Sequence, residues 1–171
     1  MTATPISLSL LLALAGTPSL PADPPGPPPG PWVECPTPHK DAACSHLYRA
    51  VELVEENRTR KAIREVGRAI QIRRSAGEYP GGELWFLANL QYHSGRMRQA
   101  ARTLDLLATE AHRVGDLDRL ALALTESIIL HAANGRREWA VARLDRLMPL
   151  LDSPYLPASR VEYIRERLIG V

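Results

Sequence analysis

The segment Gly95-Arg96-Met97-Arg98-Gln99-Ala100 occurs three times in related form along the chain. The upstream copy reads NRTRKA over residues 57–62, and the downstream copy reads GRREWA over residues 135–140. The copies therefore start 38 and 40 residues apart. Spacings of this size are typical of helical repeats, in which each unit is a pair of helices. The sequence predicts three such units.

The recurring residues have a physical reason to recur. Gly, or Asn as the next best, tolerates the left-handed backbone conformation that ends a helix. We therefore expect the first helix of each unit to end at Asn57, Gly95 or Gly135. A small Ala five residues later lets the second helix approach the first closely. The same register aligns further apolar positions, which we expect in the core: Ala62, Ala100 and Ala140; Val66, Leu104 and Leu144; Ala69, Leu107 and Leu147.

From residue 41 onward, apolar residues recur with the period of a helix. The segment Leu117–Asn134 is apolar almost all round, which predicts a central helix with neighbours on two sides. Near the C-terminus, Ser159-Arg160-Val161-Glu162 has the pattern of a capping box and predicts a helix start there. The expected helices are a first one ending near Asn57, followed by Arg58–Arg74, Glu83–Ser94, Met97–Val114, Leu117–Asn134, Arg136–Leu151, and a last one from Ser159 to just before Gly170.

The middle unit resembles a tetratricopeptide repeat at seven positions: Leu84, Leu87, Ala88, Tyr92, Gly95, Ala100 and Leu104. The resemblance extends in degenerate form over about residues 44–154. It implies an all-α fold, an antiparallel helix-pair solenoid closed by a C-terminal capping helix. The units are longer than the 34 residues usual in the family, so we expect longer helices.

The resemblance also implies a function. Proteins of this family commonly bind a protein segment in a groove without catalysing a reaction. By position in the repeat, Trp85, Asn89, Tyr92 and His93 are expected to line the groove, with Val51 and Thr125 from the neighbouring units. An alternative interpretation is that Trp85 and Tyr92 are simply packed between units.

The N-terminal residues differ from the rest. Residues 1–15 are interpreted as a signal peptide, because the apolar run from Ile6 ends in Ala13-Leu14-Ala15, a pattern that signal peptidase accepts. A run of ten residues is too short to cross a membrane of about 30 Å, so we expect no transmembrane anchor. Residues 16–40 are a Pro-rich linker, a stiff tether or else a ligand for a proline-binding groove. We expect an exported protein, periplasmic or extracellular, with its domain over residues 41–171.

Cys35 and Cys44 are the only cysteines. In an exported protein they are expected to form a disulfide that pins the end of the linker onto the first helix. A metal site with His39 and His46 is an alternative that the irregular spacing disfavours. If the protein is not exported, both thiols would be free.

The formal charge of +2 gives no reason to expect a nucleic acid or membrane partner. Basic residues nevertheless gather in the second helix, residues 58–74, where Arg60, Arg64 and Arg68 share one face. This basic face could dock an acidic partner, which would make the protein an envelope-associated structural protein. Alternatively it is a solvated face balanced by Glu52, Glu55 and Glu56. No aromatic residues alternate with the charges, which disfavours nucleic acid.

No constellation in the sequence indicates catalysis. His93, His112 and His131 fall on different helices, without an acidic or nucleophilic partner at catalytic spacing. Gly81-Gly82 lacks the Lys and Ser or Thr of a phosphate loop. We expect no catalytic residues, cofactor or metal. An active site assembled from dispersed residues is the alternative.

Overall fold

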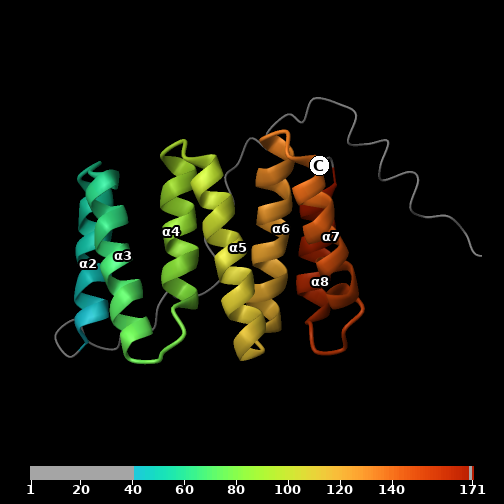
Figure 1. Cartoon of the computed structure of the whole chain (residues 1–171), viewed down its shortest axis with the longest axis horizontal. Coiled ribbons are helices and arrows are strands. Elements are labelled where there is room, and N and C mark those ends of the chain that lie inside the picture. Colours follow the sequence, from blue (N-terminus) through green and yellow to red (C-terminus); the bar gives the residue numbers. More distant parts are fainter. Residues whose placement is uncertain (1–40, 170) are drawn as a thin grey trace, which may run out of the picture.

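The computed structural model describes residues 41–169 and 171. Over these residues it contains seven α-helices and no strand, which confirms the predicted all-α class (Figure 1). The predicted signal peptide and linker lie outside the described residues. Among the described helices, none is both long enough and apolar enough to span a membrane. The helices are α2 (Ala42–Glu55), α3 (Thr59–Ser75), α4 (Gly81–His93), α5 (Met97–Val114), α6 (Leu117–Ala133), α7 (Arg137–Leu151) and α8 (Ala158–Leu168).

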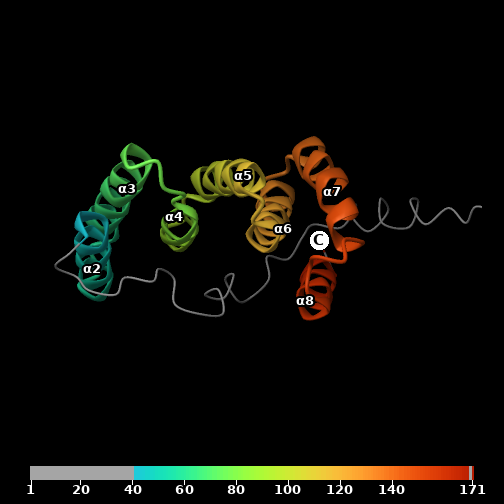
Figure 2. The ribbon, with the colours of Figure 1, turned by 90° about the horizontal axis from the view of Figure 1, so that it is seen from below.

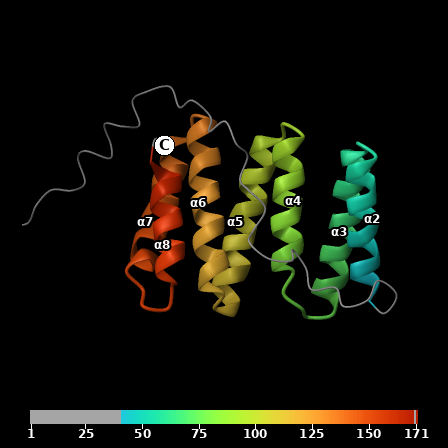
Figure 3. The same cartoon turned by 180° about the vertical axis from the view of Figure 1, so that it is seen from behind.

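Helices α2 to α7 each pack against the next one along the chain, and α3 meets α4 less closely than the other pairs meet. Helix α8 departs from this order, because it packs against α6. Viewed from below, α3, α5 and α7 lie along one side, and α2, α4, α6 and α8 along the other (Figure 2). Figure 3 shows the molecule from behind, with α8 in front of α7 and beside α6.

The three predicted left-handed residues all have positive φ: 57° at Asn57, 75° at Gly95 and 70° at Gly135. The same two backbone hydrogen bonds close each turn. After α4, for example, the Gly95 N–H donates to the Tyr92 carbonyl (2.9 Å) and the Arg96 N–H donates to the Gln91 carbonyl (2.8 Å). The prediction from the repeated segment is therefore confirmed at all three positions.

A second set of turns repeats as well, although the sequence reasoning did not identify it. Helix α3 is followed by Gly77 (φ 75°) and α5 by Gly115 (φ 77°), again 38 residues apart. The Glu78 N–H donates to the Arg73 carbonyl (2.8 Å), and the Asp116 N–H donates to the Ala111 carbonyl (2.9 Å). The first two units thus share both turns. Helix α7 ends differently, with Pro149 in its last turn and Asp152 at its end (φ −92°).

The positions aligned by the repeat form much of the core. Eight of the nine aligned residues are buried, and Leu144 is partly buried against the same cluster. Helix α6 is buried continuously from Leu120 to Ala132, as expected for a central helix. Burial of this kind is the main source of stability in a helical domain.

Ion pairs add ties between helices. Arg73 at the end of α3 contacts Asp41 (2.6 Å), Glu78 (2.6 Å) and Glu83 (3.1 Å), and so joins the start of α2 to the start of α4. Asp41 also caps α2, because its Oδ1 accepts from the Ala43 N–H at 2.8 Å. These contacts fix the first helix pair to the second.

The predicted capping box at the last helix is wrong. Helix α8 begins at Ala158, and its N-cap residue Pro157 makes no side-chain hydrogen bond. Ser159 therefore lies inside the helix. Pro157, with φ fixed at −56°, takes the N-cap position instead, two residues before Ser159. Its carbonyl accepts from the Arg160 N–H at 2.8 Å.

The glycines of helices α3 and α4 give a matched test of this packing. A Cβ at Gly81 would come within 2.6 Å of the Tyr79 hydroxyl oxygen, whereas a Cβ at Gly67 would meet nothing within 4 Å. Gly81→Ala should lower the free energy of unfolding by about 1–3 kcal/mol because the Tyr79 ring must move. Gly67→Ala should raise it by about 0.5–1 kcal/mol because Ala favours a helix interior. Urea denaturation measures both; equal effects would contradict the described packing at Tyr79.

Candidate functional site

Three of the six predicted groove residues meet at one small cavity. Trp85, Asn89 and Tyr92 of α4 line it together with Leu104, Glu126 and Leu130. Its volume of about 10 Å³ is at the lower limit for a single water molecule. The cavity is therefore a packing gap beneath the surface rather than a groove that holds a peptide.

The other three predicted groove residues lie apart from this cavity. Val51 is 46% exposed, and His93 is exposed with its ring 5.6 Å from that of Tyr92. Thr125 is fully buried and donates to the Ala121 carbonyl at 2.8 Å, so it lines no open surface. Val51 and His93 are thus the predicted residues that a partner could reach directly.

The repeat register explains why Thr125 and Trp85 are buried. Leu47, Trp85 and Thr125 each precede a left-handed residue by ten positions, and all three are almost fully buried. This position faces the packed interior of each unit. The burial of Trp85 (5% exposed) favours the alternative interpretation, in which Trp85 is packed between units and does not line an open groove.

The sequence analysis did not identify the next position of the register as part of a candidate site. Its residues are Tyr48, Phe86 and Glu126, nine positions before each left-handed residue. Their burial increases along the chain: Tyr48 is 46% exposed, Phe86 is partly buried and Glu126 is 1% exposed. These three residues could have been identified by aligning the repeats over the whole length of α2, α4 and α6.

Glu126 is a buried carboxylate with a specific partner. Arg167 of α8 donates to it from Nε (3.1 Å) and Nη2 (3.4 Å). Burial raises the pKa of Glu126, and the Arg167 guanidinium opposes that rise. A buried charge is stable only when it is paired, and α8 supplies the paired cation, Arg167.

A second pair ties the same two helices. Arg160 of α8 donates to both carboxylate oxygens of Asp118 of α6, from Nε at 2.6 Å and from Nη2 at 3.0 Å. Between the two arginines, Ile164 is fully buried. Spacings of four and seven residues place all three on one face of α8. This face, defined by Arg160, Ile164 and Arg167, holds α8 against α6.

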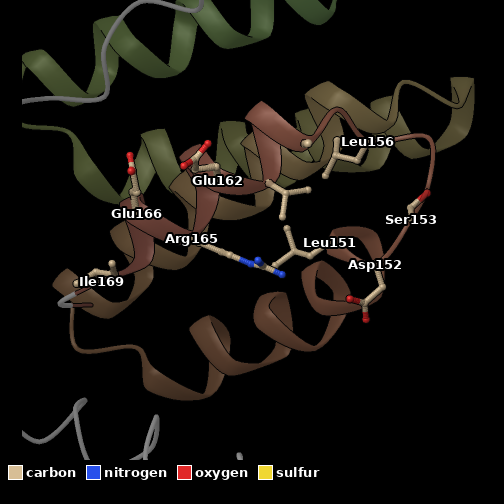
Figure 4. Close-up of a pocket in the computed structure, with 10 residues that line it drawn as sticks. Leu151, Asp152, Ser153, Leu156, Glu162, Arg165, Glu166 and Ile169 are labelled. Carbon is tan, nitrogen blue, oxygen red and sulfur yellow. The ribbon is translucent and has the colours of Figure 1, made fainter.

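The opposite side of α8 borders a cleft of about 560 Å³ toward the end of α7 (Figure 4). Its walls include the apolar residues Leu151, Leu156 and Val161. Arg165 extends from α8 toward Leu151, while Glu162 and Glu166 point away from α7. Helix α8 therefore packs directly against α6, whereas a cleft lies between its other side and the end of α7.

The predicted basic face of α3 lies on the surface. Arg60, Arg64 and Arg68 are all exposed. Arg68 pairs with Glu65 at 2.8 Å, whereas within the described part of the chain Arg60 and Arg64 form no ion pair. Glu52 and Glu56, expected to balance this face, pair instead with Arg49 (2.7 Å) and Arg58 (2.6 Å). Two positive charges therefore remain available to a partner.

His131 has an acidic partner that lies far from it in the sequence. Its Nε2 lies 3.2 Å from Oδ2 of Asp105, on α5. The same carboxylate accepts from Ser127 Oγ (2.6 Å) and from Arg143 Nη2 (2.6 Å). Asp105 and His131 are 26 residues apart, and only the packing of α5 on α6 brings them together.

This cluster joins three helices and lacks the geometry of a nucleophile with its base. Ser127 and His131 both bind the carboxylate, so the hydroxyl is not hydrogen-bonded to the imidazole. His131 is 2% exposed, and its Nδ1 has no hydrogen-bond partner among the described residues. Arg143 lies over the Trp139 ring at 4.8 Å. The cluster pins α5, α6 and α7 together.

Within residues 41–169, no group of His, Cys, Asp and Glu side chains is arranged to hold a metal ion. His46 contacts Glu65 of α3 at 2.7 Å. Cys44 is fully buried in α2, but Cys35 and His39 lie outside the described residues. The Cys35–Cys44 disulfide therefore stays a prediction.

The His131 cluster predicts a specific pH dependence. Burial lowers the pKa of His131 below its ordinary value of 6.5, although Asp105 opposes this. The unfolded chain therefore takes up the proton first, and stability falls as the pH drops below about 6.5. His131→Gln keeps a donor for Asp105 but does not titrate. It should reduce the slope of unfolding free energy between pH 7 and 5.5, by at most about 1.4 kcal/mol per pH unit.

Thermal or urea unfolding across this pH range measures the effect. His112→Gln is the matched control, because His112 is exposed on α5 and takes no part in the Asp105 cluster. An unchanged slope in His131→Gln would contradict the assigned role of His131.

Comparisons of the chain with family models, curated proteins and solved structures found no match. The function is therefore inferred from the chain's own residues and their arrangement.

Proposed function

We propose that residues 41–171 form a tetratricopeptide-like solenoid of antiparallel helix pairs that binds a segment of another protein without catalysing a reaction. The observation that carries the proposal is the repeated left-handed turn after α2, α4 and α6, with the same pair of closing hydrogen bonds each time. Repeated turns of this kind stack helix pairs and create extended surfaces suited to peptides.

The proposed binding surface lies on the side of the molecule formed by α2, α4, α6 and α8 (Figure 2). Its accessible part is at α2 and the end of α4, where Tyr48, Val51 and His93 are exposed. Tyrosine supplies a large contact area with few rotamers to immobilise, so it suits binding. The rigid helices would leave the ordering cost to the bound segment.

Export to the periplasm or the outside of the cell is part of the proposal. It rests on residues 1–15 of the sequence, where an apolar run precedes an Ala-Leu-Ala pattern. The proposed partner is therefore a protein or peptide of the cell envelope or the extracellular space.

A second candidate function uses the basic face of α3. Arg60 and Arg64 are exposed, and no described residue pairs with them, which favours docking to an acidic envelope component. In that case the protein is structural and the groove side is not required.

Two double variants distinguish these functions. Val51→Asp/His93→Asp alters the exposed groove surface, and Arg60→Glu/Arg64→Glu reverses the basic face. All four residues are exposed, so both variants should fold. In quantitative capture from the envelope fraction of the native organism, the groove variant should lose the protein partner at least tenfold, and the basic-face variant should retain it.

The reverse result would support the structural role: loss with Arg60→Glu/Arg64→Glu and retention with Val51→Asp/His93→Asp. Circular dichroism of both variants confirms that the helical content is unchanged. Arg98→Glu/Arg102→Glu, on the exposed side of α5, controls for the change in total charge.

A further inference from the structure

Helix α8 has eleven residues, a length at which an isolated helix is marginal in water. It therefore depends on its contacts with the rest of the domain. Its main packing is on α6, on the face of Arg160, Ile164 and Arg167, and Val161 and Leu168 are partly buried against the core. A cleft of about 560 Å³ lies between α8 and the end of α7. Ile164 is the one buried residue of this helix, and a short helix with so little buried apolar surface opens more readily than the core.

Departure of α8 would leave α6 with a distinctive surface. Glu126 is 1% exposed, and burial raises its pKa. Its surroundings therefore disfavour the ionised carboxylate unless a cation pairs with it. Asp118 would lose both of its hydrogen bonds from Arg160. Two carboxylates would then face the vacated space, and each is best satisfied by a guanidinium group.

The spacing of the two carboxylates matches the spacing of arginines on one face of a helix. Asp118 and Glu126 are eight residues apart on α6, so they are separated by about 12 Å along its axis. Arg160 and Arg167 are seven residues apart and span about 10.5 Å. The earlier arginine pairs with the earlier carboxylate, so α8 runs parallel to α6.

We propose that the face of α6 carrying Asp118 and Glu126 is a binding site for a helical protein segment with two arginines seven residues apart and an apolar residue between them. Helix α8 occupies this site within the same chain. A partner helix of the same chemistry binds by displacing it. The inference rests on the proposed function and adds to it a second site, on α6, together with the chemistry of the segment that this site takes.

The test uses the full chain and a fluorescent peptide of residues 156–169, which carries the sequence of α8. Arg160→Gln/Arg167→Gln in the protein weakens the internal occupant but leaves the site on α6 intact. This variant should bind the peptide at least tenfold more tightly than the unmodified chain does, because less of the site is occupied. Arg165→Gln is the matched control, because Arg165 extends toward α7; it should bind the peptide as the unmodified chain does.

The recognition chemistry is tested separately. Adding Asp118→Asn to the Arg160→Gln/Arg167→Gln variant should weaken peptide binding at least tenfold. Asp118 is 45% exposed, so this change should not disturb the fold. A peptide with glutamine in place of Arg160 and Arg167 should not bind, whereas a peptide with glutamine only at Arg165 should bind normally.

Hydrogen exchange of the unmodified chain gives a test that does not depend on any variant folding. The amides of α8 should exchange faster than those of α6, and excess peptide should accelerate exchange in α8 while leaving α6 protected. The proposal is overturned if α8 exchanges as slowly as α6 with and without peptide. It is also overturned if the Arg160→Gln/Arg167→Gln variant fails to bind the peptide or binds it independently of Asp118.

Failure here is distinguishable from failure of the proposed function. Val51→Asp/His93→Asp should leave peptide binding unchanged, because these residues lie on α2 and α4 whereas α8 packs against α6. Capture of a partner that depends on Val51 and His93, together with absent peptide binding, would overturn only the site on α6.

Discussion

The fold depends on one backbone constraint, a residue in the left-handed conformation after the first helix of each unit. Asn57, Gly95 and Gly135 have φ between 57° and 75°, a region that residues with a Cβ other than Asn and Asp rarely adopt. Each turn reverses the chain within a few residues, so the next helix lies against the one just completed. The buried alanines five residues further on then bring the helices close, and the core follows from that approach.

Apolar packing joins helices that follow one another in sequence, whereas four of the ion pairs join helices that are one unit apart. Arg74 with Glu110, Arg143 with Asp105, Arg160 with Asp118 and Arg167 with Glu126 connect residues 36 to 42 positions apart. Partly buried and bidentate pairs of this kind fix orientation more than they add stability. The last two pairs hold α8 on α6 through arginine side chains. Another helix with arginines at the same spacing could supply the same contacts.

The helices and the turns could be predicted from the sequence because they depend on local rules. The period of the apolar residues gave all seven helices, and Gly or Asn at the repeated position gave the first set of turns. The site was harder. Thr125 was assigned to the groove although its register position, shared with Leu47, faces the interior. The contact of His131 with Asp105 could not be predicted from the sequence, because it depends on how α5 and α6 are rotated against each other. Glu126 could not be recognised as a buried, paired carboxylate from the sequence, because its burial and its pairing depend on the position of α8.

Substitution at the left-handed positions tests this constraint most directly. Gly95→Ala and Gly135→Ala should each lower the free energy of unfolding by about 1–2 kcal/mol, because a Cβ is strained at positive φ. A Cβ at either position would meet no atom within 4 Å, so the loss would report backbone conformation alone. Asn57→Gly should cause no loss. Urea denaturation of the three variants gives these values. Unchanged stability in both alanine variants, or a clear loss in Asn57→Gly, would contradict the account.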